Sequence, residues 1–526
     1  MDLSDLIDRQ ASATPDKPAI RFGREVLSYA DFAKRIAATA RALKSRLGIA
    51  RGDRVGILAA NHPDYLALLY ACARLGAMLV PVNWRLAVPE QVYILANAGV
   101  RALVVEQAFA GVAGPLALEL PGVRLVGLDF LPRTGASLSG LLAGATGDGR
   151  SDGVDTSLPL LIVYTSGTTG HPKGAVLRQE ALVANAEMSR DMHGLTAEDH
   201  ALTVLPLFHV GGLNIQTTPA LQTGATVTLH ARFDADAALD AIERDLPTLT
   251  VLVPATLQAI IEHPRWEAAR LTSLRAVTTG SMQVPRRLVD AFVNRDVPVL
   301  QVYGLTETSP ISVYTRLSGD WRRPNSTGLP GSLCEARIVD EGGREAARWV
   351  PGEVVVRGPN VLAEYWANPE ATAEALREGW FHTGDIGTRD ADGHFFIHDR
   401  KKNMIISGGE NIYPAEVERV LGEHPAVAEA AVIGRAHAKW QEVPVAYVVL
   451  KAGAEAKAGE LERFCTERLA RFKVPREFLF VESLPHNALG KVQHFRLKAG
   501  AGASASGHAP ARAPRPGLWS RLFGRR

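Results

Sequence analysis

Hydrophobic and polar positions follow two alternating patterns through the first 300 residues. Short apolar runs with the length of a buried strand are followed by segments in which apolar residues recur every three or four positions, as in an amphipathic helix. The expected strands are 53–59, 77–83, 100–106, 158–163, 200–207, 247–254 and 274–280, and the expected helices are 62–76, 90–99, 178–194 and 255–263. This alternation predicts an α/β fold of parallel sheets covered by helices on both faces.

The pattern changes near residue 330. The runs 352–358 and 393–400 flank turn signals such as Asp392-Gly393 and predict short antiparallel strands. From about residue 403 the predicted order is strand, helix, strand, strand, helix (460–472) and strand. That order is enough for a separate small α+β domain of about 100 residues.

Residues 164–176, YTSGTTGHPKGAV, directly follow the apolar run 158–163. Glycines let the backbone approach an anion and let several N–H groups point at it together, so the stretch predicts a phosphate-holding loop. A plain flexible turn is the alternative. The loop is not a Walker loop, because Lys173 follows a proline and precedes a glycine where that motif needs glycine and then Ser or Thr.

Two other turns carry side chains that suit a nucleotide. The string Tyr303-Gly-Leu-Thr-Glu307 offers an aromatic face, a hydroxyl and a carboxylate at a strand end, and Mg²⁺ prefers carboxylate oxygen together with substrate phosphate. Asp385 lies in a glycine-flanked turn, where a fixed carboxylate can accept a ribose diol. The alternatives are a surface turn with an exposed glutamate and an Asx-turn that holds its own backbone.

Two basic segments near the C-terminal end do not indicate a function from their local sequence alone. The triplet 400–402 precedes the glycine pair 408–409, and Lys491 follows a glycine. A solvated turn and a surface lysine are the alternatives to a functional role for these residues.

Composition narrows the class of protein. The formal net charge is +2, and because residues 499–526 contribute five arginines and no acid, the remaining chain is net −3. An acidic body argues against a nucleic-acid partner, since phosphate contacts need a clustered basic face. Three scattered cysteines fit neither a disulfide framework nor a zinc site. The N-terminus lacks a basic segment followed by an apolar one, so we expect a cytoplasmic protein.

In their order and spacing the motifs resemble the adenylate-forming superfamily, which includes acyl- and aryl-CoA synthetases, adenylation domains of non-ribosomal peptide synthetases and beetle luciferases. The resemblance covers residues 10 to 498, and the matching segments are 164–176, 205–212, 278–281, 302–308, 364–387, 399–418 and 487–491. It implies a large N-terminal domain of parallel sheets with a distorted β-barrel subdomain, and a small mobile α+β domain. The implied limits are 1–399, 400–498 and a disordered basic tail, 499–526.

The resemblance implies a two-step reaction. A carboxylate is joined to the α-phosphate of ATP with release of pyrophosphate, and in the CoA ligases the acyl group then passes to a thiol with loss of AMP. The residues implied to bind ATP are Thr165, Ser166, Gly167, Thr168, Thr169, Gly170 and Lys173 at the β- and γ-phosphates, Gly280, Ser281, Met282, Tyr303 and Gly304 around adenine, Thr306 at the α-phosphate, and Asp385 and Arg400 at the ribose. Glu307 is implied to bind Mg²⁺.

The matches also imply a catalytic set of Lys491, Thr306, Glu307 and His209. Lys491 would bridge the substrate carboxylate and ATP, where a preorganised cation stabilises developing charge. Lys402 occupies the position of the hinge about which the small domain rotates between the two steps. His209 is expected to be a gate or wall of the acyl pocket and not a base, since a carboxylate at neutral pH needs no deprotonation.

The acyl pocket implied by the resemblance is built from segments around His209, 278–281, 303–310 and 250–254. The ranges 205–216, 250–258, 278–284 and 302–315 contain no Lys or Arg, so a second carboxylate on the substrate would lack a cation. An amino-acid substrate would find only Glu307, which is assigned to the metal. We therefore expect an apolar acid, either a fatty acid or an aryl acid.

No carrier-protein segment follows the last motif, which favours free coenzyme A as acceptor over a carrier-bound thiol. Trp440, Phe472 and Arg476 lie where some aryl-CoA ligases hold the CoA nucleotide, with an aromatic face for adenine and a cation for phosphate. A relative that loads a carrier protein is the alternative. The expected protein is a monomer or homodimer, and weak membrane contact through the segment 517–526 is the alternative to a disordered tail.

Overall fold

The computed structural model describes residues 1–165, 172–281, 284–323, 325–407, 410–437, 440–486 and 491–498. They divide into two compact units, which meet in sequence between Lys401 and Lys402.

A nine-stranded sheet carries the largest part of the first unit. Its strands, in spatial order, are β16 (Leu329–Pro330), β15 (Val313–Tyr314), β14 (Val299–Tyr303), β13 (Ala276–Gly280), β12 (Leu249–Val251), β10 (His200–Thr203), β11 (Thr226–Leu229), β1 (Pro18–Phe22) and β2 (Glu25–Ser28). The pairs from β14 through β1 are parallel, and the strands at the two edges are antiparallel. The C-terminal ends of β13 and β14 therefore lie next to each other, on the same side of this sheet.

An eight-stranded sheet holds the glycine-rich segment. Its strands, in spatial order, are β19 (Glu364–Tyr365), β9 (Lys173–Arg178), β8 (Pro159–Thr165), β4 (Met78–Pro81), β3 (Arg54–Leu58), β5 (Ala102–Val105), β6 (Arg124–Gly127) and β7 (Ala136–Ser137). Strands β8 and β9 pair antiparallel, with Thr165 opposite Lys173. Residues 166–171, between them, lie outside the described residues.

A third, curled sheet completes the first unit. Its strands are β17 (Glu335–Val339), β18 (Gly352–Arg357), β21 (Trp380–Arg389), β20 (Leu376–Arg377) and β22 (Phe395–Arg400), all paired antiparallel. In the pairing of β21 with β22, Asp385 stands opposite Arg400. The hairpin thus places two of the expected ribose-binding residues side by side.

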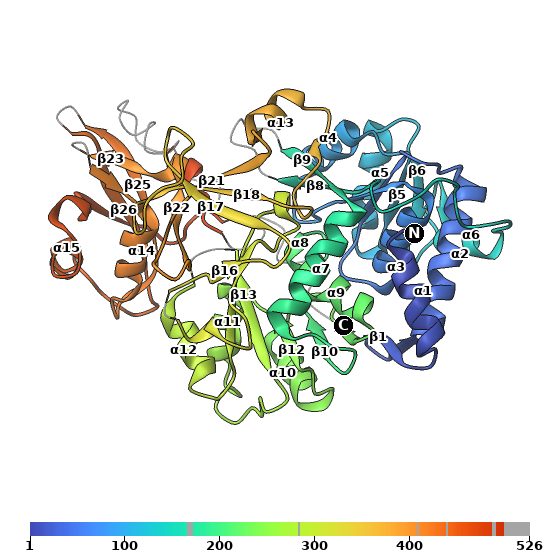
Figure 1. Ribbon diagram of the computed structural model, residues 1–526, viewed down its shortest axis with the longest axis horizontal. Helices are drawn as coiled ribbons and strands as arrows, with labels where there is room; N and C mark the ends of the chain where they lie inside the picture. The colour runs from blue at the N-terminus through green and yellow to red at the C-terminus, as the bar shows by residue number, and fades with distance from the viewer. Residues whose placement is uncertain are drawn as a thin grey trace. The chain divides into compact units, whose positions relative to one another are not determined.

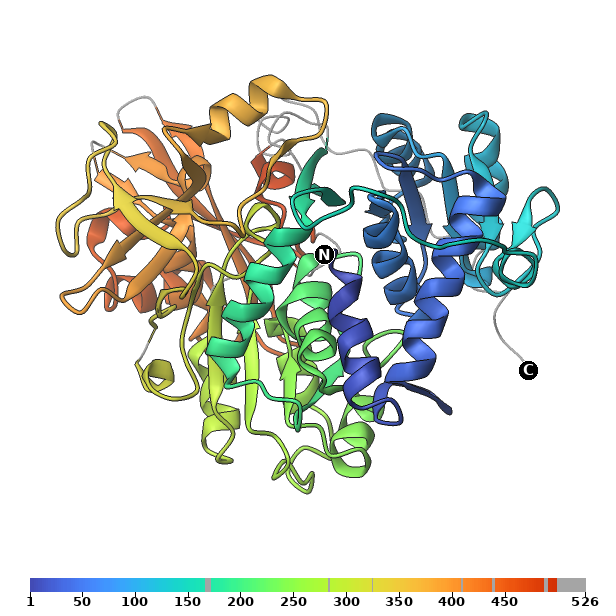
Figure 2. The same ribbon diagram turned by 45° about the vertical axis from the view of Figure 1, so that its right-hand side comes forward.

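Helices cover the faces of the parallel sheets. The α-helices of the first unit are α1 (Ser4–Ala13), α2 (Tyr29–Leu47), α3 (Pro63–Leu75), α4 (Val88–Ala98), α5 (Ala110–Glu119), α6 (Leu138–Ala143), α7 (Gln179–His193), α8 (Val210–Gly212), α9 (Thr218–Thr223), α10 (Ala235–Arg244), α11 (Pro254–Ile261), α12 (Arg286–Val293) and α13 (Pro369–Ala375). Figures 1 and 2 show α1, α2 and α3 packed side by side. A π-helix, η2 (Leu213–Thr217), joins α8 to α9.

Helix α3 shows how local sequence sets these elements. The side chain of His62 accepts the N–H of Asp64 at the N-terminus, and Pro63 occupies the first helical position, where a missing N–H costs nothing. The helix ends at Gly76, whose φ of 64° is left-handed. Residues 65–73 and Leu75 are apolar and fully buried, so α3 is a core helix.

The second unit is a small α+β domain. Its sheet has the order β24 (Glu410–Ile412), β23 (Ile405–Ser407), β26 (Gln441–Leu450) and β25 (Val427–His437), and β27 (Glu477–Phe480) pairs parallel with β26. Helices α14 (Pro414–Gly422) and α15 (Ala458–Thr466) pack on a core that includes Ile405, Val432 and Leu461. Within the residues described in either unit, no helix has the length and apolar character needed to cross a membrane.

The predicted α/β class, the parallel sheets and the late antiparallel strands are confirmed. Two predictions of local structure were wrong. The helix expected over 460–472 ends at Thr466, and a turn and a short 3₁₀ helix lead to Val474, where the following proline disfavours helical backbone. The loop predicted over 164–176 is strand at both ends, because Tyr164 and Thr165 end β8 and Lys173 begins β9, whose residues 174–177 are buried against β8.

Candidate active site

The site is built where β13 and β14 end. In their parallel register Gly280 lies opposite Val302, and a Cβ at position 280 would overlap the carbonyl oxygen of Val302. Glycine is therefore required for this approach of the two strands. Ser281, the next residue, has a left-handed φ of 70°, a conformation that non-glycine residues adopt mostly at special positions.

The turn after β14 is equally close-packed. A Cβ on Gly304 would overlap the carbonyl oxygen of Pro310, so this position also needs glycine. The short helix η3 (Thr306–Thr308) follows, capped by the Thr308 hydroxyl, which accepts the N–H of Leu305 at 2.9 Å. Glu307 is 7% exposed. The backbone thus presents Thr306 and Glu307 from a fixed turn directly beyond Tyr303.

Asp385 joins Tyr303 to Arg400. The Tyr303 hydroxyl donates to Oδ2 of Asp385 at 2.8 Å, and Nε of Arg400 lies 2.6 Å from Oδ1. The backbone of Asp385 is held by the Thr383 hydroxyl, which accepts its N–H at 3.0 Å. Each oxygen of this 6%-exposed carboxylate therefore has a separate partner. Three of the expected nucleotide-binding residues form one hydrogen-bonded cluster.

The charges in this cluster support one another. Burial and then the carboxylate of Asp385 raise the pKa of Tyr303 above its usual value, so its hydroxyl stays protonated and donates. Burial opposes the charge of Arg400, but Asp385 and Glu307 outweigh it and raise the pKa of the guanidinium. Both carboxylates therefore stabilise the charged form of Arg400, and Asp385 is in direct contact with it.

Glu307 has a partner that the sequence analysis did not find. The hydroxyl of Tyr365, in β19, donates to Oε1 of Glu307 at 2.8 Å, and the hydroxyl of Thr165 lies 3.5 Å from the same oxygen. Nζ of Lys173 lies 5.6 Å from the ring centre of Tyr365, in cation–π contact. Burial and the charge of Glu307 raise the pKa of Tyr365. The segment EYW, within the matched range 364–387, was the only sequence signal for this tyrosine.

This arrangement suits a divalent cation. The hydrogen bonds from Tyr365 and Thr165 both fall on Oε1 of Glu307, and among the described residues no hydrogen bond engages Oε2. A single fixed carboxylate beside a nucleotide site is the kind of protein ligand that Mg²⁺ takes together with substrate phosphates. Glu307 therefore fits the metal that the motif implies.

His209 stands apart from the cluster. It precedes α8 and packs against Phe208, with ring centres 4.5 Å apart. Burial, and then the charge of Arg85, lower the pKa of His209 to about 3, so the ring is neutral at physiological pH. Its Nε2 is buried and has no hydrogen-bond partner within the described ranges. These features fit a pocket wall and do not fit a general base.

Several expected site residues are not placed in this cluster. Residues 166–170, Met282, the tail 499–526 and the side chain of Lys402 lie outside the described part of the chain. Lys491, Trp440, Phe472 and Arg476 belong to the second unit, where Lys491 is half-buried and Trp440 and Phe472 each expose 37% of their surface. Arg476 is exposed and its N–H binds the carbonyl of Pro444 at 2.8 Å.

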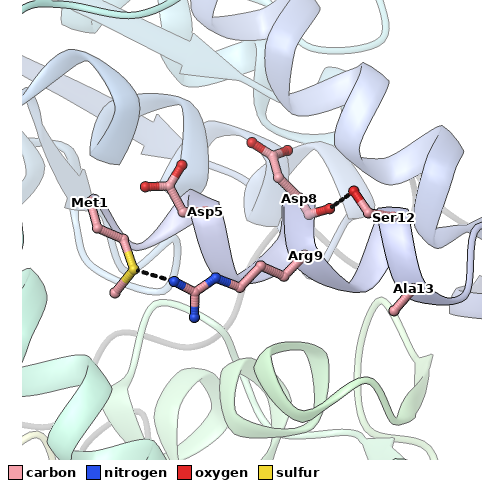
Figure 3. Close-up of a pocket in the computed structure, with 6 residues that line it drawn as sticks. All are labelled: Met1, Asp5, Asp8, Arg9, Ser12 and Ala13. Carbon is pink, nitrogen blue, oxygen red and sulfur yellow. Dashed lines mark hydrogen bonds between the residues drawn. The ribbon is translucent and has the colours of Figure 1, made fainter.

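A hollow elsewhere in the first unit lies at the N-terminal helix α1. It has a volume of about 690 Å³ and is lined by α1 and the residues before it (Figure 3). The acids Asp5 and Asp8 on its wall are already paired with Arg150, each at 2.7 Å. None of the expected site residues lines it.

Family models match most of the chain. The model described as AMP-binding enzyme matches residues 7–366, and the model described as AMP-binding enzyme C-terminal domain matches residues 416–491. The first match alone covers more than half of the chain and contains the Tyr303 to Glu307 turn.

Individual relatives match over nearly their full length. The chain is 49% identical to an indoleacetate–CoA ligase of Aromatoleum aromaticum, over 94% of this chain and 97% of the relative. It is 40% identical to a feruloyl-CoA synthase of an Amycolatopsis species, over 92% and 96% of the two chains. Among solved structures, o-succinylbenzoate CoA synthetase of Bacillus subtilis, in complex with its acyl-adenylate intermediate, is similar with a TM-score of 0.84, at 31% identity over 94% and 97% of the two chains.

Proposed function

The chain belongs to the AMP-binding enzyme family and is an AMP-forming acid–CoA ligase, and from this premise we propose that its acid is aromatic. The observation that carries the proposal is the 49% identity to an indoleacetate–CoA ligase over 97% of that relative. The absence of Lys and Arg from the segments expected to line the acyl pocket supports it, because an aromatic tail needs no counter-ion there. A fatty acid, the other class expected from the sequence, is then the less favoured substrate.

Tyr303, Asp385 and Arg400 are proposed to hold the nucleoside of ATP. The Asp385 carboxylate is fixed by Tyr303 and Arg400, so it is preorganised to accept the ribose hydroxyls. The glycines at 280 and 304, with Ser281, Met282 and the Tyr303 ring, are proposed to line adenine, and Thr306 to contact the α-phosphate. The segment 165–170 and Lys173 are proposed to hold the β- and γ-phosphates.

Glu307 is proposed to bind Mg²⁺, held in place by Tyr365. When bound, the ion would neutralise charge on the phosphate oxygens as pyrophosphate leaves. The hydroxyl of Tyr365 fixes the direction of the carboxylate, and Lys173 places a second positive charge beside the same tyrosine. The protein itself thus orients the charges at the transferring phosphorus.

The second unit is proposed to supply the remaining groups. Lys491 would contact the reacting carboxylate during adenylation, and Trp440, Phe472 and Arg476 would bind the nucleotide of CoA. The proposed domains are 1–399 and 400–498 with Lys402 as hinge, and the boundary between the two compact units, at Lys401/Lys402, supports that position. A carrier-bound thiol remains the alternative acceptor, although the named relatives are CoA ligases.

The reaction is tested with a panel of acids. With ATP, Mg²⁺ and CoA, an aromatic acid such as indole-3-acetate or a hydroxycinnamate is expected to yield AMP, pyrophosphate and acyl-CoA in equal amounts. Chromatography of the nucleotides together with thioester absorbance measures all products. Formation of ADP would contradict the proposed chemistry, and turnover of fatty acids alone would contradict the proposed acid.

Replacing Tyr365 with phenylalanine tests the position of Glu307. Loss of a hydrogen bond to a charged group costs about 1.5–3 kcal/mol, so the adenylation rate is expected to fall about 10- to 100-fold. Because the carboxylate would lose its fixed direction, the Mg²⁺ concentration for half-maximal rate should rise as well. A matched control is Tyr447→Phe in β26 of the second unit. An unchanged Mg²⁺ dependence would contradict the role given to Tyr365.

A further inference from the structure

A polar stripe on α7 supports the π-helix η2. Asn185, Ser189 and His193 recur every fourth residue and are all fully buried. The amide of Asn185 donates to the carbonyl of Asn214 at 2.5 Å, and the hydroxyl of Ser189 donates to the carbonyl of Ile215 at 2.6 Å. A π-turn disturbs the regular helical hydrogen bonds and is frequent at functional sites. The stripe supplies side-chain partners for this irregular turn.

The ring of His193 has a defined tautomer. Its Nδ1 lies 2.7 Å from the carbonyl oxygen of Ser189, and a carbonyl only accepts, so Nδ1 carries the proton. Its Nε2 is then an acceptor, and it lies 2.8 Å from the hydroxyl of Thr278 in β13. Burial lowers the pKa of His193 to about 4, so the ring stays neutral at physiological pH.

The tautomer of His193 sets the direction of the Gln216 amide. Nε2 of Gln216 lies 3.2 Å from Nε2 of His193 and 3.2 Å from the hydroxyl oxygen of Thr278. If the amide were reversed, two acceptors would face each other and the single Thr278 proton could serve only one of them. The NH₂ group of Gln216 therefore points into the network, and its carbonyl oxygen points away.

That carbonyl oxygen is left as a buried acceptor. Gln216 is 2% exposed, and within the described part of the chain its Oε1 has no hydrogen-bond partner. An unsatisfied buried acceptor is costly and marks a place where a donor is expected. Gln216 is seven residues beyond His209, and Thr278 is two residues before Gly280, so both lie in segments assigned to the acyl pocket.

We propose that Oε1 of Gln216 accepts a hydrogen bond from a ring-borne N–H or O–H of the acid. The preferred substrates are then aromatic acids that carry such a donor on the ring, and not simple aryl or fatty acids. The inference rests on the proposed function, because it concerns the acyl pocket of the same ligase. His193 and Thr278 are positioning residues in it, since they orient the amide and do not touch the acid.

The test compares isosteric acids with and without the donor. Indole-3-acetate and 1-benzofuran-3-acetate differ only in a ring N–H replaced by oxygen, and 4-hydroxycinnamate and 4-methylcinnamate make the same comparison for an O–H. Acid-dependent AMP formation gives kcat/KM for each acid. We expect the wild-type protein to prefer one donor-bearing acid about 10-fold or more over its isostere, since a site built to bind a donor rejects the analogue that lacks it.

Two variants test whether Gln216 causes the preference for donor-bearing acids. Gln216→Met keeps the length of the side chain but removes the acceptor, and it should bring the ratio of kcat/KM between the paired acids to about 1. Gln222→Met is the matched control, because Gln222 is a buried glutamine of α9 that is 8% exposed and lies outside the network. The control should keep the wild-type ratio.

Each outcome bears on the inference. If the wild-type protein gives a kcat/KM ratio near 1 for both pairs of acids, the inference is overturned without any variant. That result would follow if a bound water already donated to Oε1 of Gln216. A Gln216→Met protein that keeps the preference also overturns the inference. If Gln216→Met does not fold, Thr278→Val, which frees the amide from its fixed direction, should reduce the preference, and an unchanged ratio there overturns the inference. Failure of the proposed function is distinct, since none of the four aromatic acids, with or without the donor, would then give AMP.

Discussion

Replacing Asp385 with asparagine is expected to lower kcat/KM for ATP by about 30- to 150-fold, corresponding to about 2–3 kcal/mol. The carboxylate is 6% exposed and pairs with both Tyr303 and Arg400, so its removal leaves the guanidinium without its nearest counter-charge. Breaking a fully buried pair costs about 3–5 kcal/mol. We expect a smaller effect because the Arg400 side chain is 35% exposed and water screens it in part.

The measurement is ATP–pyrophosphate exchange at varied ATP, with the melting temperature recorded for each variant. Asp392→Asn is the matched control, because Asp392 lies between the same two strands, pairs with Arg323 at 2.9 Å and is 65% exposed. It should change kcat/KM by less than about two-fold, as expected of a surface ion pair. If the folded Asp385→Asn protein has a lower melting temperature but unchanged kinetics, the cluster of Tyr303, Asp385 and Arg400 stabilises the fold and does not bind ATP.

The parts of this molecule that could be predicted from its sequence are those set by local chemistry. Helix α3 was predictable because its apolar residues, its first-turn proline and its left-handed Gly76 lie within 15 residues of one another. The strand ends at Gly280 and Tyr303 were predictable for the same reason. The roles of the motif residues stay predictions, although the structure brings Tyr303, Asp385 and Arg400 into contact.

Contacts across long stretches of sequence could not be predicted. Tyr365 and Glu307 lie 58 residues apart, and the pairing of β19 with β9 and the hydrogen bond from the N–H of Leu362 to the carbonyl of Glu307 bring the tyrosine to the turn after β14. The direction of the Gln216 amide depends on a histidine 23 residues earlier and a threonine 62 residues later. The tautomer of His193 could not be predicted from a sequence pattern, because its proton is placed by the carbonyl of Ser189, which faces the ring only in the folded helix.

The two half-reactions are expected to respond to different lysines. If Lys491 contacts the reacting carboxylate only during adenylation, Lys491→Ala removes a preorganised charge from that transition state. Loss of one such group costs on the order of 3–4 kcal/mol, so acid-dependent pyrophosphate release should fall about 10²- to 10³-fold. Thioester formation from a supplied acyl-adenylate should be spared. Lys451→Ala, which removes an exposed lysine of the same unit, is the control and should change neither step.

Lys402→Pro is expected to have the converse effect. The boundary between the two compact units falls at this residue, and proline fixes φ, so a rotation about it would be blocked. Adenylation would then continue while transfer of the acyl group to CoA falls. Both variants are assayed for pyrophosphate release and for thioesterification of synthetic adenylate. Because a fixed arrangement of the two units would make each lysine matter equally in both steps, equal losses in the two assays would rule out alternation about Lys402.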